Sequence, residues 1–206
     1  MTYIDFSKKE QKSDWSKSLN PNGRIPTMVV RGNDDFVVFE SGAILWYLAE
    51  KYQKFLPEGE KARCQALQWL MFQMSGIGPM MGQAMYFQRI AEPQGHRDEF
   101  AITRYGTESR RLLEVLDKQL EGKTYILGND FTIVDMATYP WARAYYWAKV
   151  VDGLNNLPGW FDRIDARPAT QRALELPKPF PAFFGKGDVG AAEAANSARF
   201  QSDIKP

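Results

Sequence analysis

Two consecutive residues, Glu40 and Ser41, carry the side chains needed to hold both charged ends of an amino acid. They lie where a β-branched and aromatic run, Val37–Phe39, is followed by apolar residues at the three- and four-residue spacing of a helix. A serine hydroxyl at a helix N-cap, the first-turn amides and the helix dipole together favour a bound carboxylate. A glutamate beside them would bind an ammonium group. The simpler interpretation, a helix cap with a solvated glutamate, stays open.

A proline directly before an apolar run, in NPNGRIPTMVV, marks a turn that presents free backbone groups. Pro26 has no backbone donor and disfavours helix at Ile25. From the residues alone we expect an ordinary trans proline that opens an edge strand, because only about 5% of X-Pro bonds are cis.

The other reactive side chains are interpreted as structural or solvated. Cys64 falls on the apolar side of a helical pattern and is expected to be a buried small hydrophobe rather than a nucleophile. His96, the only histidine, lies in a polar loop, so no histidine pair exists for a metal. Arg104 lies on a helical pattern, where a lone arginine is usually a surface charge. Neither the G-x-S-x-G nor the P-loop spacing occurs.

A methionine-rich stretch covers residues 71–85 with aromatic neighbours. Methionines at helical spacing are usually core filler, and we favour that interpretation over a partly open apolar pocket. The glycines and proline of GIGP are expected to kink or break the helical pattern that covers residues 60–90.

Short strand-like runs and helices alternate in the first fifty residues, which predicts a small α/β unit. The second and third strands are joined by a hairpin turn at GNDD. The predicted strands are Tyr3–Phe6, Thr27–Val30 and Phe36–Phe39, and the predicted helices are Lys12–Leu19 and the segment from Ser41 to Tyr52.

Beyond the charged linker QKFLPEGEKA, strand signals nearly vanish, which predicts an all-helical unit. Residues 98–120 repeat leucines at helical spacing. Thr132 and Asp135 form a capping-box pattern, with aspartate in place of the usual glutamate, that opens another helix. We therefore expect an α/β domain at 1–53, an all-α domain at 60–177 and an extended or partly disordered tail at 178–206.

The charge balance and the cysteine content argue against a nucleic-acid-binding, membrane-bound or disulfide-rich secreted protein. Lysine and arginine number 26 against 25 for aspartate and glutamate, so no strong field of one sign points to a nucleic acid or a membrane surface. One cysteine in 206 residues excludes an internal disulfide framework and favours a reducing compartment, the cytoplasm. No apolar run reaches the length of a membrane span or a signal peptide.

Six fragments, in this order, resemble the glutathione S-transferase superfamily and, more narrowly, its Nu-class bacterial and Ure2-like fungal branch. The match runs from Tyr3 to Leu176. The fragments are NPNGRIPTMVV, FESGAILWYLAEKY, LQWLMFQMSGIGPMMGQ, RYGTESRRLLEVLDKQL, FTIVDMATYPW and RPATQRAL. The resemblance implies a thioredoxin-like domain followed by a helical bundle, in a homodimer with the site between the domains.

The resemblance also implies how glutathione is held. Ile25, before a cis Pro26, would offer its backbone to the cysteinyl portion, and Glu40 with Ser41 would hold the γ-glutamyl end.

Three further positions match binding residues of the family. Gln11 and Arg24 match positions near the charged ends of the tripeptide. Arg104 matches an arginine that reaches the site from the helical domain, often across the dimer, and helps to hold a second glutathione or glutathione disulfide. No metal is implied.

One departure from the family pattern is expected. Family members begin with a further strand and helix, about 25 residues by ordinary element lengths, whose connecting loop carries the threonine and asparagine that stabilise the thiolate. No catalytic residue is therefore identified here, because those positions lie upstream of Met1. Without that strand, unpaired backbone groups would each cost about 1–3 kcal/mol. We expect a start assigned too late, pairing of Tyr3–Phe6 with Thr27–Val30, or a strand lent by a partner chain.

Two hypotheses for the function follow from the resemblance. The first is an enzyme, a glutathione transferase or glutathione-dependent disulfide oxidoreductase that acts on a small electrophilic or disulfide substrate. The second is a non-catalytic, Ure2-like glutathione-binding regulatory protein or an N-terminally truncated inactive form.

Overall fold

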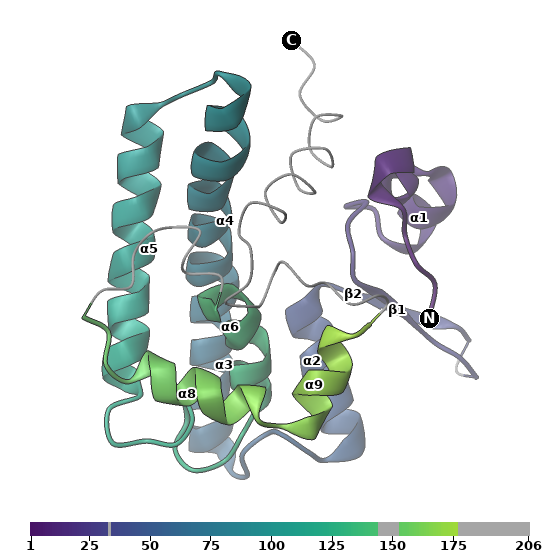
Figure 1. The fold of residues 1–206 in the computed structure, drawn as a ribbon. Helices are drawn as coiled ribbons and strands as arrows, with labels where there is room; N and C mark the ends of the chain where they lie inside the picture. Colours follow the sequence, from purple (N-terminus) through teal and green to yellow (C-terminus); the bar gives the residue numbers. More distant parts are fainter. Residues whose placement is uncertain (33, 144–152, 177–206) are drawn as a thin grey trace.

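The computed structural model describes residues 1–32, 34–143 and 153–176. A small unit with a two-stranded sheet and helices lies beside a larger, all-helical unit (Figure 1). This arrangement confirms the predicted class, α/β followed by all-α. The predicted tail at 178–206 lies outside the described residues.

The sheet is a hairpin of two strands, β1 (Thr27–Val30) and β2 (Phe36–Phe39). They pair antiparallel in the register that puts Thr27 opposite Phe39. Helix α2 (Ser41–Tyr52) follows directly and packs on the hairpin. All three elements have their predicted bounds. The hairpin thus brings residue 40 to the point where the sheet meets the helix.

The predicted strand at Tyr3–Phe6 is wrong. The Asp5 N–H donates to the Glu10 carboxylate at 2.7 Å, and the Glu10 N–H donates to the Asp5 carbonyl at 3.2 Å. These local bonds occupy the backbone groups that a strand would need. The expected pairing with β1 is therefore wrong as well, and within the described residues the sheet has two strands. The segment instead continues into two 3₁₀ turns and helix α1, at Phe6–Lys8, Glu10–Lys12 and Asp14–Leu19.

A long helical rod begins the second unit. Helix α3 (Glu60–Phe72) continues through a π-helical segment, η3 (Gln73–Ile77), into α4 (Gly78–Tyr86), and a second π-helical segment, η4 (Phe87–Ala91), follows. Figure 1 shows α3 and α4 along one axis. The α-helical pattern is interrupted near GIGP as expected, but by a wider π-helical turn that ends at Ile77 and not by a complete break, because a π-bulge keeps the chain helical.

The remaining helices complete the bundle. Helix α5 packs along α4, and α8 packs against α6. Leu113, Leu116 and Trp160 are fully enclosed in the core, which confirms the buried leucine stripe predicted for residues 98–120. The described elements are η5 (Glu92–Gln94), α5 (Glu99–Gln119), α6 (Ile133–Arg143), α8 (Leu157–Asp165) and α9 (Pro168–Leu174).

A buried carboxylate, Asp135, connects the start of α6 to the core. The Thr132 hydroxyl accepts from the Val134 N–H at 3.3 Å, and Asp135 accepts from the Thr132 N–H at 2.9 Å, so the predicted capping box is confirmed. The same carboxylate accepts from the Ile126 N–H at 3.0 Å and from the Trp160 indole at 2.9 Å. Burial raises the pKa of Asp135, and the four donors, including the Thr132 hydroxyl, act against that rise.

The linker joins the two units through backbone and ring contacts. The Ile133 N–H, in the first turn of α6, donates to the Phe55 carbonyl at 3.0 Å. The Phe55 ring meets the Phe131 ring edge to face, with centroids 6.2 Å apart. Ala49 of α2 packs with Leu70 of α3 in a small apolar cluster. These contacts fix α2 against the helical unit.

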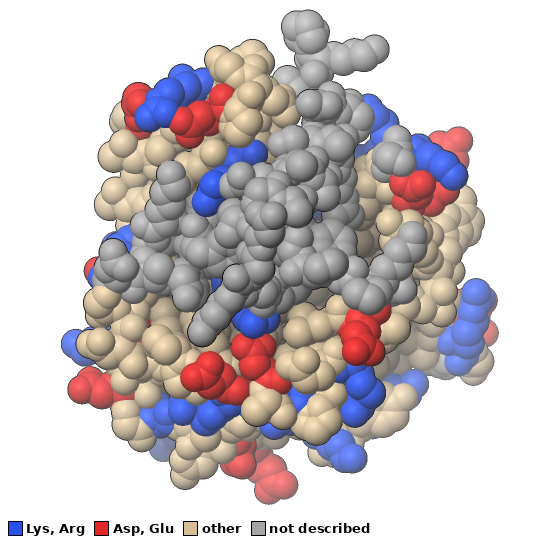
Figure 2. All heavy atoms as spheres, in the orientation of Figure 1, with Lys and Arg blue, Asp and Glu red and all other residues tan. Residues whose placement is uncertain are grey.

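Basic and acidic side chains are interspersed over the described part of the face shown in Figure 2, as expected from a formal net charge of +1. Among the described residues, the helices are all too short or too polar to cross a membrane.

Candidate functional site

Glu40 lies at the junction of β2 and α2 in a backbone conformation that favours glycine. Its φ is 69° and its ψ is 123°. It occupies the cap position of α2, and its carbonyl accepts from the Ile44 N–H at 2.9 Å. A residue other than glycine with such a φ costs of order 1–3 kcal/mol, and such residues cluster at functional sites.

Ser41 is the first residue of α2 and not its cap, so the predicted capping role is wrong. Within the described part of the chain, its exposed hydroxyl has no hydrogen-bond partner. The N–H groups of the first helical turn, at Ser41, Gly42 and Ala43, precede the first intrahelical bond. The helix start therefore combines a free hydroxyl, free amides and the positive end of the helix dipole.

The loop between α1 and β1 is held by Asn20, which is 1% exposed. Its side-chain oxygen accepts from the Asn22 N–H at 3.0 Å, and its side-chain nitrogen donates to the Arg24 carbonyl at 2.8 Å. Between them, Gly23 has φ 59°, and a Cβ there would lie 2.9 Å from the backbone oxygen of Gln11. Only glycine fits this turn without a backbone shift.

The loop ends at a cis peptide bond between Ile25 and Pro26. The trans form expected from the residues alone is wrong, and the cis form implied by the resemblance is confirmed. The side-chain nitrogen of Asn22 lies 3.5 Å from a Glu40 carboxylate oxygen, so the loop and the helix start are neighbours. The exposed Arg24 guanidinium forms no ion pair with any described residue.

Gln11 is closer to the interior than expected for a residue that contacts a ligand. It is 6% exposed, and its side-chain oxygen has no hydrogen-bond donor among the described residues. It lies beneath the Gly23 turn. The structure thus brings Gln11 to the same loop as Arg24 and Ile25, as a buried acceptor that lacks a donor.

Arg104 is not brought to this loop within one chain. It is an exposed residue of α5, which packs along α4, whereas α2 packs against α6 and the hairpin. Figure 1 shows α5 and α2 on opposite sides of the helical unit.

An apolar hollow of about 690 Å³ opens beside Glu40, between α2 and α3. Met74 closes against Gly42, where a Cβ would lie 2.9 Å from the Met74 methyl carbon. Met71 is 49% exposed, so the interpretation of the methionines as core filler is wrong for this residue. It holds for Met81, which is buried.

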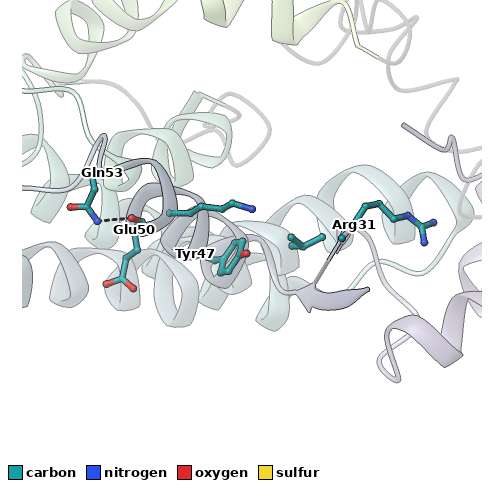
Figure 3. A pocket seen from close by; sticks show the side chains of 7 residues that line it. Arg31, Tyr47, Glu50 and Gln53 are labelled. Carbon is teal, nitrogen blue, oxygen red and sulfur yellow. Dashed lines mark hydrogen bonds between the residues drawn. The ribbon is translucent and has the colours of Figure 1, made fainter. Parts of the chain in front are cut away.

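A second hollow of about 760 Å³ lies at the other end of α2 (Figure 3). Its charged groups already have partners: Arg31 pairs with Asp35, Glu50 pairs with Arg63, and the Lys51 ammonium group lies 5.7 Å from the centre of the Tyr47 ring. Gln53 donates to the Glu50 backbone carbonyl at 2.6 Å. We assign no ligand to this hollow.

No group of three or more metal-binding side chains occurs among residues 1–32, 34–143 and 153–176. Cys64 is exposed, so its expected burial is wrong. Asn20 and Asn22 hold the loop before Pro26 by side-chain bonds, whereas the sequence alone predicted there only a turn with free backbone groups. Their signal was two asparagines on either side of a proline, a pattern in which side chains commonly bond to the turn.

Comparison with known proteins places these features in a family. A model of the glutathione S-transferase N-terminal domain matches residues 2–51, and a model of the C-terminal domain matches residues 76–168. The disulfide-bond oxidoreductase YfcG of Escherichia coli is 39% identical over 178 residues, which cover 83% of this chain and 80% of YfcG. Glutathione S-transferase 1 of Schizosaccharomyces pombe is 41% identical over 145 residues, and the chain spans only 61% of its length.

Solved structures give the same result. A glutathione transferase from Pseudomonas putida, with one glutathione disulfide bound per subunit, superposes with a TM-score of 0.78 at 38% identity, covering 84% of this chain and 79% of that one. Ure2p in complex with glutathione superposes with a TM-score of 0.77 at 28% identity, covering 84% of this chain and 81% of that one.

Proposed function

Because the chain belongs to the glutathione S-transferase family, we propose that it binds glutathione or glutathione disulfide and uses the glutathione thiol to reduce disulfides. YfcG of Escherichia coli is named as a disulfide-bond oxidoreductase, which supports disulfide reduction as the reaction. The alternative reaction for a glutathione transferase is transfer of glutathione to a small electrophile.

One observation carries the proposal: the unpartnered Ser41 hydroxyl at the start of α2 lies directly beside the Glu40 carboxylate. The γ-glutamyl end of glutathione has an α-carboxylate and an α-ammonium group on the same carbon. The carboxylate would accept from the Ser41 hydroxyl and the first-turn amides, and the ammonium group would donate to Glu40.

The loop from Asn20 to Pro26 would hold the rest of the tripeptide. Ile25 offers its backbone to the cysteinyl portion before the cis Pro26, and the free guanidinium of Arg24 suits a carboxylate. The buried Gln11 oxygen lacks a donor, which an N–H of the ligand would supply.

The proposed reaction consumes two glutathione molecules for each disulfide. The thiolate of bound glutathione attacks one disulfide sulfur, forms a mixed disulfide and expels a thiolate that takes a proton from water. A second glutathione thiolate then attacks the glutathione sulfur of the mixed disulfide. Glutathione disulfide and a second thiol leave, so one disulfide is reduced and two glutathione molecules are oxidised. The described residues bind and orient the peptides, whose sulfurs do the chemistry.

The proposal is tested by measuring turnover of hydroxyethyl disulfide with glutathione, together with calorimetric titration of glutathione disulfide. We expect saturable binding and turnover above the uncatalysed rate. Binding without turnover would favour the alternative of a non-catalytic glutathione-binding regulator, which the similarity to Ure2p supports. Absence of binding of either redox form to folded protein would end both proposals.

Replacing Ser41 with alanine should weaken glutathione binding about fivefold, the loss of one ordinary hydrogen bond. The thermal midpoint should stay unchanged, because this hydroxyl bonds to no other described residue. Titration calorimetry and a thermal melt measure the two effects.

Asp98→Ala is the matched control. Asp98 is a true helix cap that accepts from the Ala101 N–H at 3.0 Å. Its loss should lower the free energy of unfolding by about 1 kcal/mol and leave glutathione affinity unchanged. A fall in the Ser41→Ala melting midpoint with unaltered affinity would show that Ser41 only supports the helix.

We also propose that the apolar hollow beside Glu40 is covered by a second copy of the chain. Leu67 and Met71 of α3 are 42% and 49% exposed beside it, so a second copy that covers the hollow would remove apolar surface from water. A twofold contact on this face would bring residues of the partner to the rim of the site, and Arg104, remote from its own Glu40, would act there on the second peptide.

Met71→Asp should convert this dimer to a monomer, because burying one unpaired carboxylate on each side of a twofold contact costs several kcal/mol. Sedimentation velocity measures the change. Val115→Asp is the control, since Val115 is exposed to a similar degree, 37%, on α5 away from the hollow. Wild-type protein that sediments as a monomer at working concentration would contradict the proposal.

The finer family assignment follows the motifs. The run QWLMFQMSGIGPMMGQ supports membership of the Nu-class and Ure2-like branch. We propose residues 1–53 as the glutathione-binding domain, residues 60–177 as the helical domain, and the cytoplasm as the compartment, since the exposed thiol of Cys64 suits reducing conditions.

A further inference from the structure

We propose that Asn20 is a positioning residue for the glutathione site, acting on the Ile25 backbone through Arg24 and on the Glu40 carboxylate through Asn22. The inference rests on the proposed function and names a residue that touches no ligand. Asn20 is the cap residue at the end of α1, where the loop begins, and is almost completely buried.

The first connection runs to the bend that faces the cysteinyl portion. The Asn20 side-chain nitrogen donates to the Arg24 carbonyl at 2.8 Å. That carbonyl belongs to the peptide unit whose nitrogen is the Ile25 N–H, so the bond fixes the plane of that amide. The Thr27 hydroxyl approaches the same carbonyl at 3.5 Å, which is too long to hold it alone.

The second connection runs to the helix start. The Asn20 side-chain oxygen accepts from the Asn22 N–H at 3.0 Å, and its backbone oxygen accepts from the Gly23 N–H at 2.8 Å. These bonds hold Asn22 so that its side-chain nitrogen faces the Glu40 carboxylate at 3.5 Å. At this distance the contact is weak, so it only biases the orientation of the carboxylate and leaves its charge for a ligand ammonium group.

Asparagine is the side chain whose chemistry these two connections require. It carries a donor and an acceptor on one short, planar group, and both are used here. Aspartate has the same shape but only acceptors when ionised, so Asn20→Asp would keep the bond from Asn22 and place an anion against the Arg24 carbonyl. Asn20→Asp therefore disrupts the connection to Arg24 and keeps the connection to Asn22.

The test compares Asn20→Asp, Asn22→Ala and Ser13→Ala with wild type, using dissociation constants for glutathione, thermal midpoints and steady-state kinetics with hydroxyethyl disulfide. We expect Asn20→Asp to raise the dissociation constant and the KM for glutathione about tenfold, with kcat at saturation within about twofold. Asn22→Ala, at an exposed position, should raise the dissociation constant about threefold. Ser13→Ala removes the N-cap of the same helix α1, so it should lower the melting midpoint without changing affinity.

The outcomes separate this inference from the proposed function. Wild-type protein that binds neither redox form of glutathione overturns both. Wild-type binding with unchanged affinity in folded Asn20→Asp overturns the positioning role alone, and an equal loss of affinity in Ser13→Ala does the same, because destabilised α1 would then explain it. If Asn20→Asp does not fold, unchanged affinity in Asn22→Ala overturns the role, and a loss there supports it.

Discussion

Replacing Asp135 with alanine should lower the free energy of unfolding by about 4 kcal/mol, since buried donors without a partner cost about 1–3 kcal/mol each. The carboxylate accepts from the Ile126 and Thr132 N–H groups, the Thr132 hydroxyl and the Trp160 indole, all of them buried. Urea unfolding followed by tryptophan fluorescence measures the loss, which should lower the thermal midpoint by roughly 8–16 °C.

Two further substitutions sharpen this result. Asp135→Asn keeps one acceptor oxygen, so it should lose about half as much stability. Asp130→Ala removes an exposed carboxylate five residues earlier and should change the free energy of unfolding by less than about 0.5 kcal/mol. A loss in Asp135→Ala as small as that of Asp130→Ala would contradict the central role given to this carboxylate.

Replacing Glu40 with glycine should weaken glutathione binding by about 10- to 100-fold while the protein becomes no less stable. The affinity falls because the ligand ammonium group loses a charged acceptor, worth about 1.5–3 kcal/mol. The free energy of unfolding should hold or rise by about 1 kcal/mol, because glycine adopts φ 69° without the cost that a side chain imposes. Calorimetric titration measures the affinity for glutathione, and a thermal melt measures the stability.

Glu40→Gln is the control that keeps the backbone cost and removes only the charge. It should weaken binding about tenfold with an unchanged melting midpoint. If Glu40→Gly lowered stability and left affinity intact, the strained backbone would serve the hairpin rather than a ligand.

Local chemistry made much of the fold predictable from the sequence. The two strands are β-branched runs on either side of a turn, α2 begins where that run ends, and the Thr132–Asp135 pair opens α6. The place of Glu40 and Ser41 at the strand–helix junction was predictable in the same way, whereas their binding of a ligand stays a prediction.

The features that depend on distant contacts were not predictable in this way. At Tyr3–Phe6 a turn bonded through Glu10 replaces the strand that the residue types favour. The cis bond at Pro26 follows from the family pattern and not from the proline itself. The two asparagines beside Pro21 indicate side-chain bonds to a turn, but the partners of Asn20, at Asn22, Gly23 and Arg24, depend on how the loop folds.

The π-helical segment Gln73–Ile77 has a consequence for how related chains should be compared. A π-bulge corresponds to one extra residue in an otherwise regular helix, so side chains after it are turned by about 100° relative to an uninterrupted helix. A relative that lacks the bulge would align correctly up to Phe72 and then be displaced by one position. The extra residue in the π-helical segment thus determines which side chains of α4 face the core. An alignment without a gap at GIGP would therefore pair residues whose side chains point in different directions.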